Sequence, residues 1–306
     1  MTVDYFRDRR EGIFQERAQI PDYVGVISMP YGNVGSMTSW GGDGNFEYFQ
    51  PLGKNFHFTL RGNFTLSKNK INNWEEATQP YPYLSKTGFS NDVQRGFISL
   101  GLFKDQQDVD MSPEQFGTVR PGDIKYKDVN GDGEITTADR TMIGDPTPDV
   151  TYGITLGVNY KNWELGIDMM GQGGNQIFRT WDNYNWSQFN FMEQRMDRWH
   201  GPGTSNTQPL LNTKHTINNL NSEYYIEDGS FFRIRNVQLA YNFDKTLISR
   251  IGMQALKLYV NIQNLKTWKH NTGYTPELGG SAIAFGVDDG SYPMPAIYTF
   301  GFNLTF

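Results

Sequence analysis

One pattern recurs along the chain: long apolar side chains occupy every second position, and small or polar residues lie between them. The last nine residues show it most clearly, with Tyr298, Phe300, Phe302, Leu304 and Phe306 alternating with Thr299, Gly301, Asn303 and Thr305. Successive side chains of a strand point to opposite faces, so this pattern predicts a strand with one aromatic and one polar face. Such a strand suits lipid on one side and a wet lumen on the other.

The same alternation returns in earlier segments, and strand candidates fall near residues 3–14, 44–50, 55–68, 96–104, 150–160, 162–170, 230–243, 255–265 and 296–306. Alternation alone also describes a soluble all-β protein with one solvated face per sheet. Several of these runs, however, reach the roughly 9 to 11 residues that a tilted strand needs to cross a bilayer, whereas strands in soluble proteins have a mode of about 5 to 6. Their length favours a membrane barrel.

Composition narrows the choice of protein class. Aromatic residues make up 15% of the 306 residues, and many lie at the ends of the alternating runs, as in an aromatic girdle. The mean hydropathy is -0.59 and no stretch approaches 18 consecutive apolar residues, which excludes a helical membrane protein. A net charge of -6, with 27 basic residues that form no basic stripe, argues against a nucleic-acid partner. Without cysteine there is neither a disulfide framework nor a thiolate metal site.

The connections between the candidate strands are unequal in length. Short ones occur at residues 51–54, 161–162 and 244–249, and the longest covers residues 171–229. Short turns on one side and long outward-facing loops on the other are typical of outer-membrane barrels. We therefore predict an all-β, transmembrane antiparallel β-barrel, with 171–229 as a long extracellular loop and 121–145 as an insertion. The residues after Met1 lack the apolar run of an export signal, so we expect a fragment or a mis-started chain.

The sharpest chemical motif is a candidate calcium loop at residues 128–139. Oxygen-bearing side chains occupy its positions 1, 3, 5 and 12, and Gly133 occupies the sixth position, where an EF-hand loop turns sharply. The predicted ligands are the side chains of Asp128, Asn130, Asp132 and Asp139, the carbonyl of Glu134, and Thr136 directly or through water. Two departures from an EF-hand are Asp139 in place of Glu and an extended segment in place of the preceding helix. The alternative interpretation is an Asp/Asn/Gly turn without metal.

No residue arrangement indicates catalysis. The four histidines share no metal-ligand spacing, and none belongs to a nucleophile or base motif. Asp197, Arg198 and His200 form a potential acid–base cluster, but they lie in a turn-rich loop whose polarity explains them. We therefore predict that the protein is not an enzyme.

A group of aromatic residues in the long connection provides candidate substrate contacts. These are Trp181, Tyr184, Trp186 and Trp199. Such rings either stack on sugar faces or pack the loop, and the sequence favours neither.

Several segments, in order along the chain, resemble the late region of the SusC/RagA family of TonB-linked outer-membrane proteins. They are residues 121–133, 139–144, 148–153, 227–236 and 260–265, together with the closing aromatic strand. The resemblance implies a nutrient importer in the outer membrane, surrounded by lipid, that takes oligosaccharides or peptides with a SusD-like surface lipoprotein and the TonB complex. Large plugged transporters have about 22 strands, so we expect the C-terminal barrel portion, without the plug domain and signal peptide.

Two alternatives to the transporter remain at this stage. A calcium-stabilised soluble β-sandwich that binds carbohydrate would suit both the aromatic loop and the calcium motif. A β-rich hydrolase would need an acid, base or nucleophile arrangement, which the sequence does not supply.

Overall fold

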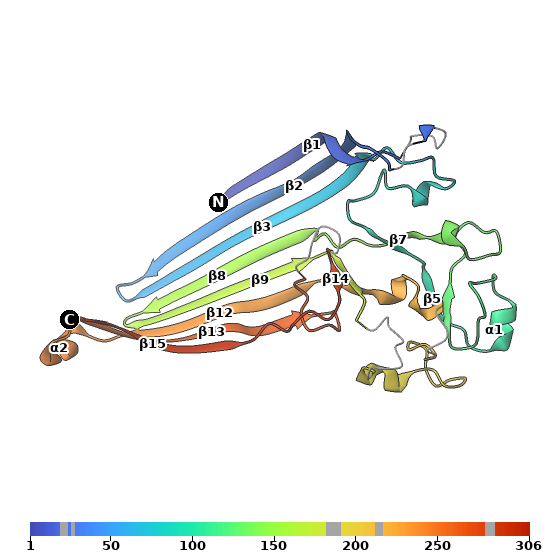
Figure 1. Cartoon of the computed structure of the whole chain (residues 1–306). Helices are drawn as coiled ribbons and strands as arrows, with labels where there is room; N and C mark the ends of the chain where they lie inside the picture. The colour runs from blue at the N-terminus through green and yellow to red at the C-terminus, as the bar shows by residue number, and fades with distance from the viewer. Residues whose placement is uncertain (19–23, 26–27, 182–190, 212–216, 279–284) are drawn as a thin grey trace.

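The computed structural model describes the whole chain except residues 19–23, 26–27, 182–190, 212–216 and 279–284. The described part of the chain consists mainly of two regions (Figure 1). The first is a large antiparallel sheet, called here the sheet. The second, at one end of the strands, is built from the described residues of 74–149, 174–230 and 270–296 and is called the loop-side region.

The sheet has eight strands in the spatial order β1, β2, β3, β8, β9, β12, β13, β15. Their bounds are Thr2–Glu16, Tyr31–Leu52, Phe56–Asn73, Val150–Tyr160, Trp163–Gly173, Phe231–Asn242, Ala255–Lys269 and Ile297–Thr305. Every neighbouring pair is antiparallel. All the strand candidates except the one near residues 96–104 correspond to strands of this sheet.

The candidate near 96–104 was wrong as a single strand. It divides into β4 (Gln94–Gly96) and β5 (Ser99–Leu102), which pair with β7 (Thr141–Gly144) and β6 (Ile124–Tyr126) in two small separate sheets. The physical reason is its apolar residues: Phe97 and Phe103 are buried within the loop-side region. They therefore serve a local core and not a lipid-facing row.

Strand β2 is much longer than the predicted 44–50. Its N-terminal half contains glycines, which interrupt the apolar alternation that marks a strand. Gly41 is required there, because a Cβ at this position would lie 1.9 Å from the backbone oxygen of Leu66 on β3. Pairing with β1 and β3 along its whole length holds this half extended.

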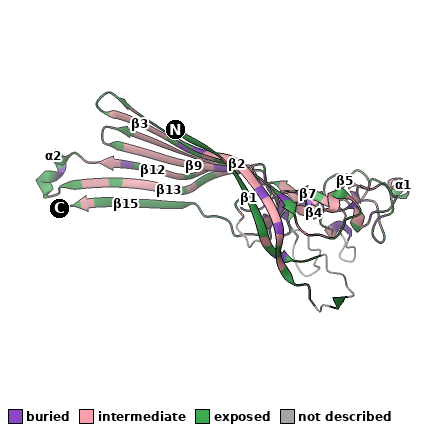
Figure 2. Cartoon of the chain, turned by 90° about the horizontal axis from the view of Figure 1, so that it is seen from above, coloured by how far each residue is buried: buried purple, intermediate pink, exposed green. Residues whose placement is uncertain are grey.

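The strand register collects the apolar residues on one face, called the apolar face. Leu60 is opposite Leu156, and Leu156 is opposite Ile167. Nothing in the described part of the chain covers this face: Phe300 is 80% exposed. Strands in Figure 2 are accordingly coloured mainly as intermediate or exposed. A β-sandwich would pack a second sheet here, so the described residues do not support that alternative.

Aromatic side chains cross the apolar face in two rows. The row at the loop-side end includes Tyr152, Phe232 and Trp268, and the row at the other end includes Phe56, Tyr160, Trp163 and Tyr241. From Tyr152 to Tyr160 strand β8 rises about 26 Å at ~3.3 Å per residue. With the strand tilt of about 35–45° that is typical of outer-membrane barrels, this length covers about 19–22 Å of height, close to the apolar band of about 25 Å that lies between two aromatic girdles.

The loop-side region has its own hydrophobic core. Phe97, Ile124, Tyr126, Ile135 and Ile217 form a buried cluster. Around it lie a three-stranded sheet and short helices: β10 (Gln176–Arg179), β11 (Ile226–Asp228), β14 (Val287–Asp288), α1 (Gln106–Asp110), η2 (Pro82–Leu84), η3 (Thr137–Asp139), η4 (Glu193–Asp197), η5 (Ile217–Asn219) and η6 (Glu223–Tyr225). The long connection thus starts after Gly173, the end of β9, and carries secondary structure of its own.

The opposite end of the sheet has only short connections. Tight turns join β2 to β3 and β8 to β9, and α2 (Lys245–Ile248) with η7 (Ser249–Ile251) joins β12 to β13 (Figure 1). The predicted asymmetry of loop lengths is therefore confirmed. Within the described ranges, no helix is both long and apolar enough to span a membrane.

Candidate functional site

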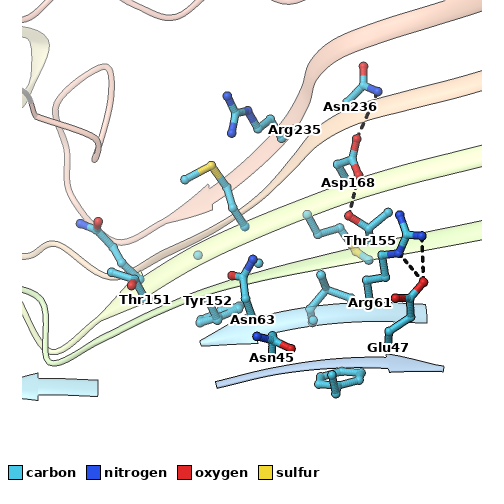
Figure 3. A pocket seen from close by; sticks show the side chains of 18 residues that line it. Asn45, Glu47, Arg61, Asn63, Thr151, Tyr152, Thr155, Asp168, Arg235 and Asn236 are labelled. Carbon is cyan, nitrogen blue, oxygen red and sulfur yellow. Dashed lines mark hydrogen bonds and ion pairs between the residues drawn. The ribbon is translucent and has the colours of Figure 1, made fainter. Parts of the chain in front are cut away.

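The face of the sheet opposite the apolar face, called the polar face, contains a hollow of about 680 Å³ (Figure 3). Strands β2, β3, β8, β9 and β12 line it. Its polar side chains include Asn45, Asn63, Thr155, Asp168, Arg235 and Asn236. The absence of a side chain at Gly153 leaves room beside Asn63. A Cβ at this position would lie only 2.9 Å from the Asn63 amide oxygen. The small residues of the alternating pattern thereby create room on this face.

Hydrogen bonds fix the polar side chains across neighbouring strands. The Thr155 hydroxyl donates to Asp168 Oδ1 at 2.8 Å, and the Asn236 amide nitrogen lies 3.4 Å from Asp168 Oδ2. Arg61 Nε donates to Glu47 Oε1 at 2.9 Å. Amides, hydroxyls and paired charges of this kind bind a polar ligand by hydrogen bonds.

The sequence alone pointed to none of the polar residues that line this hollow, and Arg235 is one of them. It lies at a register shift between Ile234 and Asn236 that occurs in the ladders with both β9 and β13. The side chain is exposed and makes no ion pair with any described residue. It also borders a second hollow of about 510 Å³, where Arg233 is held by Glu277 at 2.5 Å. In the sequence, the break in the alternation of apolar and polar residues at positions 231–236 is the feature that could have pointed to Arg235.

The candidate calcium loop is closed by its own hydrogen bonds. Asp128 accepts the backbone N–H of Gly131 at 2.6 Å on Oδ1 and that of Gly133 at 2.9 Å on Oδ2. Gly133 has a φ of +90°, a left-handed conformation that favours glycine. The hydrogen bond from Gly133, opposed by desolvation, holds the pKa of Asp128 below its ordinary value. Its carboxylate is therefore charged at neutral pH.

Asp139 anchors the loop from within the loop-side region. It is fully buried and accepts the backbone N–H groups of Val129 and Thr136, each at 2.8 Å. The backbone N–H of Ile135 donates to the carbonyl oxygen of Glu114 at 2.7 Å, and this hydrogen bond attaches the loop to the segment around Glu114. The extended segment predicted before the loop is confirmed as β6.

The donor set of this loop consists of oxygen atoms, which is the chemistry that calcium requires. Nevertheless, no three His, Asp or Glu side chains in the described part of the chain come together as a metal-binding group. A bound ion would also draw on the amide oxygen of Asn130 and the carbonyl of Glu134. Asn130 Oδ1 now accepts the Asp132 N–H at 2.9 Å. The residues fit both a calcium loop and a self-closed turn.

The aromatic candidates occupy different surroundings. The Arg179 guanidinium lies 5.5 Å from the centre of the Trp181 ring. The Trp199 ring lies against Gly122, where a Cβ would be 2.4 Å from it, so one face of this ring packs on the chain itself. Tyr184 and Trp186 lie outside the described residues. A role in substrate binding stays a prediction for all of them.

Comparisons with known proteins connect this architecture to a family. No protein-family model matches the chain. TonB-dependent receptor P3 of Formosa agariphila is 26% identical over 333 residues, which cover 100% of this chain and 32% of the relative. TonB-dependent receptor P26 of the same organism is 32% identical over 228 residues, covering 72% of this chain and 23% of the relative. TonB-dependent receptor SusC of Bacteroides thetaiotaomicron is 22% identical over 311 residues, or 93% of this chain and 29% of SusC.

The solved structure of the RagAB peptide transporter has the same fold, with a TM-score of 0.74 at 19% identity over 99% of this chain and 33% of that chain. The chain belongs to the SusC/RagA family of TonB-dependent receptors. It spans about a third or less of the length of the relatives that it matches. Its sheet is a portion of the family's β-barrel. The apolar face is accordingly the lipid-facing side, and the polar face lines the lumen.

Proposed function

We propose that this chain is the C-terminal barrel portion of an outer-membrane transporter that imports nutrients, either oligosaccharides or peptides. The polar hollow between the Arg61–Glu47 pair and the Asp168 network carries this proposal, because it offers hydrogen-bonding groups on the lumen-facing side next to the loop-side region. The names of the relatives support the transporter class. The hollow offers groups that would bind a substrate by hydrogen bonds. We therefore propose that the protein is a transporter and not an enzyme.

The loop-side region gives the proposed transporter its outward-facing end. Residues 171–229 would form the main extracellular connection, and a SusD-like lipoprotein would close over this end of the barrel. The TonB complex would supply energy from the other side. The structural similarity to the RagAB peptide transporter supports this two-component arrangement.

The transport proposal is tested by filling the hollow in the full-length receptor. Thr155 points into the hollow, whereas its neighbour Leu156 lies on the lipid-facing row and does not line the hollow. Thr155→Trp should reduce uptake of fluorescent oligopeptides or oligosaccharides at least tenfold, whereas Leu156→Trp should leave uptake near wild type. A heat-dependent gel shift shows that both variants assemble. Wild-type uptake of neither ligand class, or equal uptake by both variants, would contradict the proposal.

The proposed calcium site is tested separately by titration calorimetry of the full-length receptor with calcium. The double variant Asp128→Ala and Asp132→Ala removes two anionic ligands, so the binding signal should disappear. Glu134→Ala is the matched control, because this residue would contribute only its carbonyl oxygen. If the wild-type receptor binds no calcium at millimolar concentration, the loop is a metal-free turn.

A further inference from the structure

The lipid-facing side of β1, β2 and β3 carries a group of cations and aromatic rings toward its loop-side end. Tyr5, Arg7, Thr38, Trp40, Lys70 and Asn72 line a hollow of about 460 Å³ there, called here the basic rim patch. It is separate from the polar hollow, which lies on the opposite face of the sheet.

The strand register places this patch directly after the apolar row. On β3, Phe64 and Leu66 belong to that row, and Lys70 shares their face because side chains alternate along a strand. Gly42 is the partner of both Leu66 and Tyr5, and Trp40 is the partner of Arg7. The patch therefore continues the lipid-facing surface toward the loop-side end.

Two cations of the patch have no counter-charge. Arg7 and Lys70 are exposed, and neither forms an ion pair within the described part of the chain. The other cations nearby are neutralised, since Arg9 pairs with Glu11 at 2.8 Å and Lys68 with Asp149 at 3.3 Å. This local positive charge contrasts with the net charge of -6 for the whole chain.

The composition of the patch matches a membrane interface. Tyrosine and tryptophan gather at the level of lipid headgroups, and arginine and lysine attract anionic lipids. A guanidinium also binds phosphate oxygens in a bidentate manner. A soluble anion would meet the two cations but would gain nothing from the adjoining row of Phe64 and Leu66.

We propose that the basic rim patch binds the phosphate of an anionic lipid headgroup, with the acyl chains of that lipid lying along the apolar row of β3. Arg7 and Lys70 hold the phosphate, and Tyr5 and Trp40 pack against the glycerol level of the lipid. The inference goes beyond transport. It rests on the placement of the apolar face against lipid.

The test uses the full-length receptor reconstituted in vesicles of equal parts phosphatidylglycerol and phosphatidylcholine, then extracted in mild detergent. Native mass spectrometry counts each lipid retained per receptor. Wild type should retain phosphatidylglycerol over phosphatidylcholine at least fivefold, and the double variant Arg7→Ala with Lys70→Ala should lose most of this preference. Conservative exchange, Arg7→Lys with Lys70→Arg, should restore it.

A matched control removes the same number of positive charges, both from β1. Arg9→Ala with Arg10→Ala deletes one paired cation of the lipid-facing side and one of the other face, where Arg10 lies near Asp8. This control should keep the wild-type preference. Equal loss in the control, unchanged preference in the Arg7 and Lys70 variant, or displacement of the lipid by millimolar inorganic phosphate would overturn the proposal. Failure of wild type to give a heat-modifiable barrel would instead contradict the barrel assignment.

Discussion

The sheet and the loop-side region treat their apolar residues in opposite ways. In the loop-side region Ile124 is fully buried and Tyr126 is 1% exposed, whereas Phe300 and Phe302 of the sheet are 80% and 67% exposed. One region is stabilised by burial within the chain, and the other leaves its apolar surface for lipid. The same chain therefore uses its apolar residues in two ways: in the loop-side region they form a small buried core, and in the sheet they form a surface that faces lipid.

The polar groups of the two regions also differ in how far they are buried. In the core of the loop-side region, several polar groups are buried and paired: the Tyr126 hydroxyl donates to the Ile217 carbonyl at 2.7 Å, and the Asn218 amide donates to Asp123 at 2.9 Å. Burial raises the pKa of Tyr126 above its ordinary value, so the hydroxyl stays protonated. On the polar face of the sheet, by contrast, charged groups such as Arg61 and Arg235 remain exposed. Buried polar groups thus fix structure, and exposed ones remain available for ligands.

The largest expected effect separates the two regions energetically. Ile124→Ala removes fully buried apolar volume, so the loop-side region should lose about 2–5 kcal/mol of stability. Hydrogen exchange of residues 97–126 in the full-length receptor should accelerate. The heat-dependent gel shift should remain, because Ile124 supports no strand of the sheet. Loss of the gel shift in this variant would show that the two regions do not fold separately.

Next in size is the contrast between the faces of the sheet. Leu60→Arg places a charge near the middle of the lipid-facing row and should cost about 2–4 kcal/mol in chemical unfolding of the assembled receptor. Its sequence neighbour Thr59 lies on the lumen-facing side opposite Gly157, where there is room. Thr59→Arg should therefore cost about 1 kcal/mol or less. Equal costs at the two positions would refute the assignment of faces.

A smaller effect probes the packing of Trp199. Gly122 has a φ of +88° and lies beneath the Trp199 ring. Gly122→Ala should cost about 1–3 kcal/mol, since alanine is strained in this conformation. If Trp199 serves packing, Gly122→Ala and Trp199→Ala should increase protease cleavage of the loop-side region equally. A loss of ligand binding in Trp199→Ala without increased cleavage would favour a substrate contact instead.

The smallest effect is a pH dependence confined to the calcium loop. The folded pKa of Asp128 is lowered, first by the Gly133 N–H hydrogen bond. A lowered pKa contributes stability above the unfolded value of about 3.9, and this contribution is lost as the pH falls through the folded value. Hydrogen exchange at Gly131 and Gly133 should therefore accelerate below about pH 4, after correction for intrinsic rates. Asp128→Asn should abolish that dependence.

Local sequence patterns are sufficient to predict most strands of the sheet and the short turns between them. Alternation along residues 150–160 and 297–305 is sufficient to predict strands with an apolar and a polar face, because side chains of an extended backbone alternate regardless of what pairs with it. The short turns and the family motifs are likewise local. The extended segment before the calcium loop and the turn-forming Gly133 were also predicted from sequence.

Only the tertiary structure decided features that depend on pairing between distant strands. β2 extends through its glycines because β1 and β3 hold it, and the segment near 96–104 divides because Phe97 and Phe103 fill a core. The position of Arg235 between two hollows follows from a register shift in two ladders. Likewise, Arg7 and Lys70 meet only through β2, since register is set by long-range hydrogen bonds and not by the alternation within one strand.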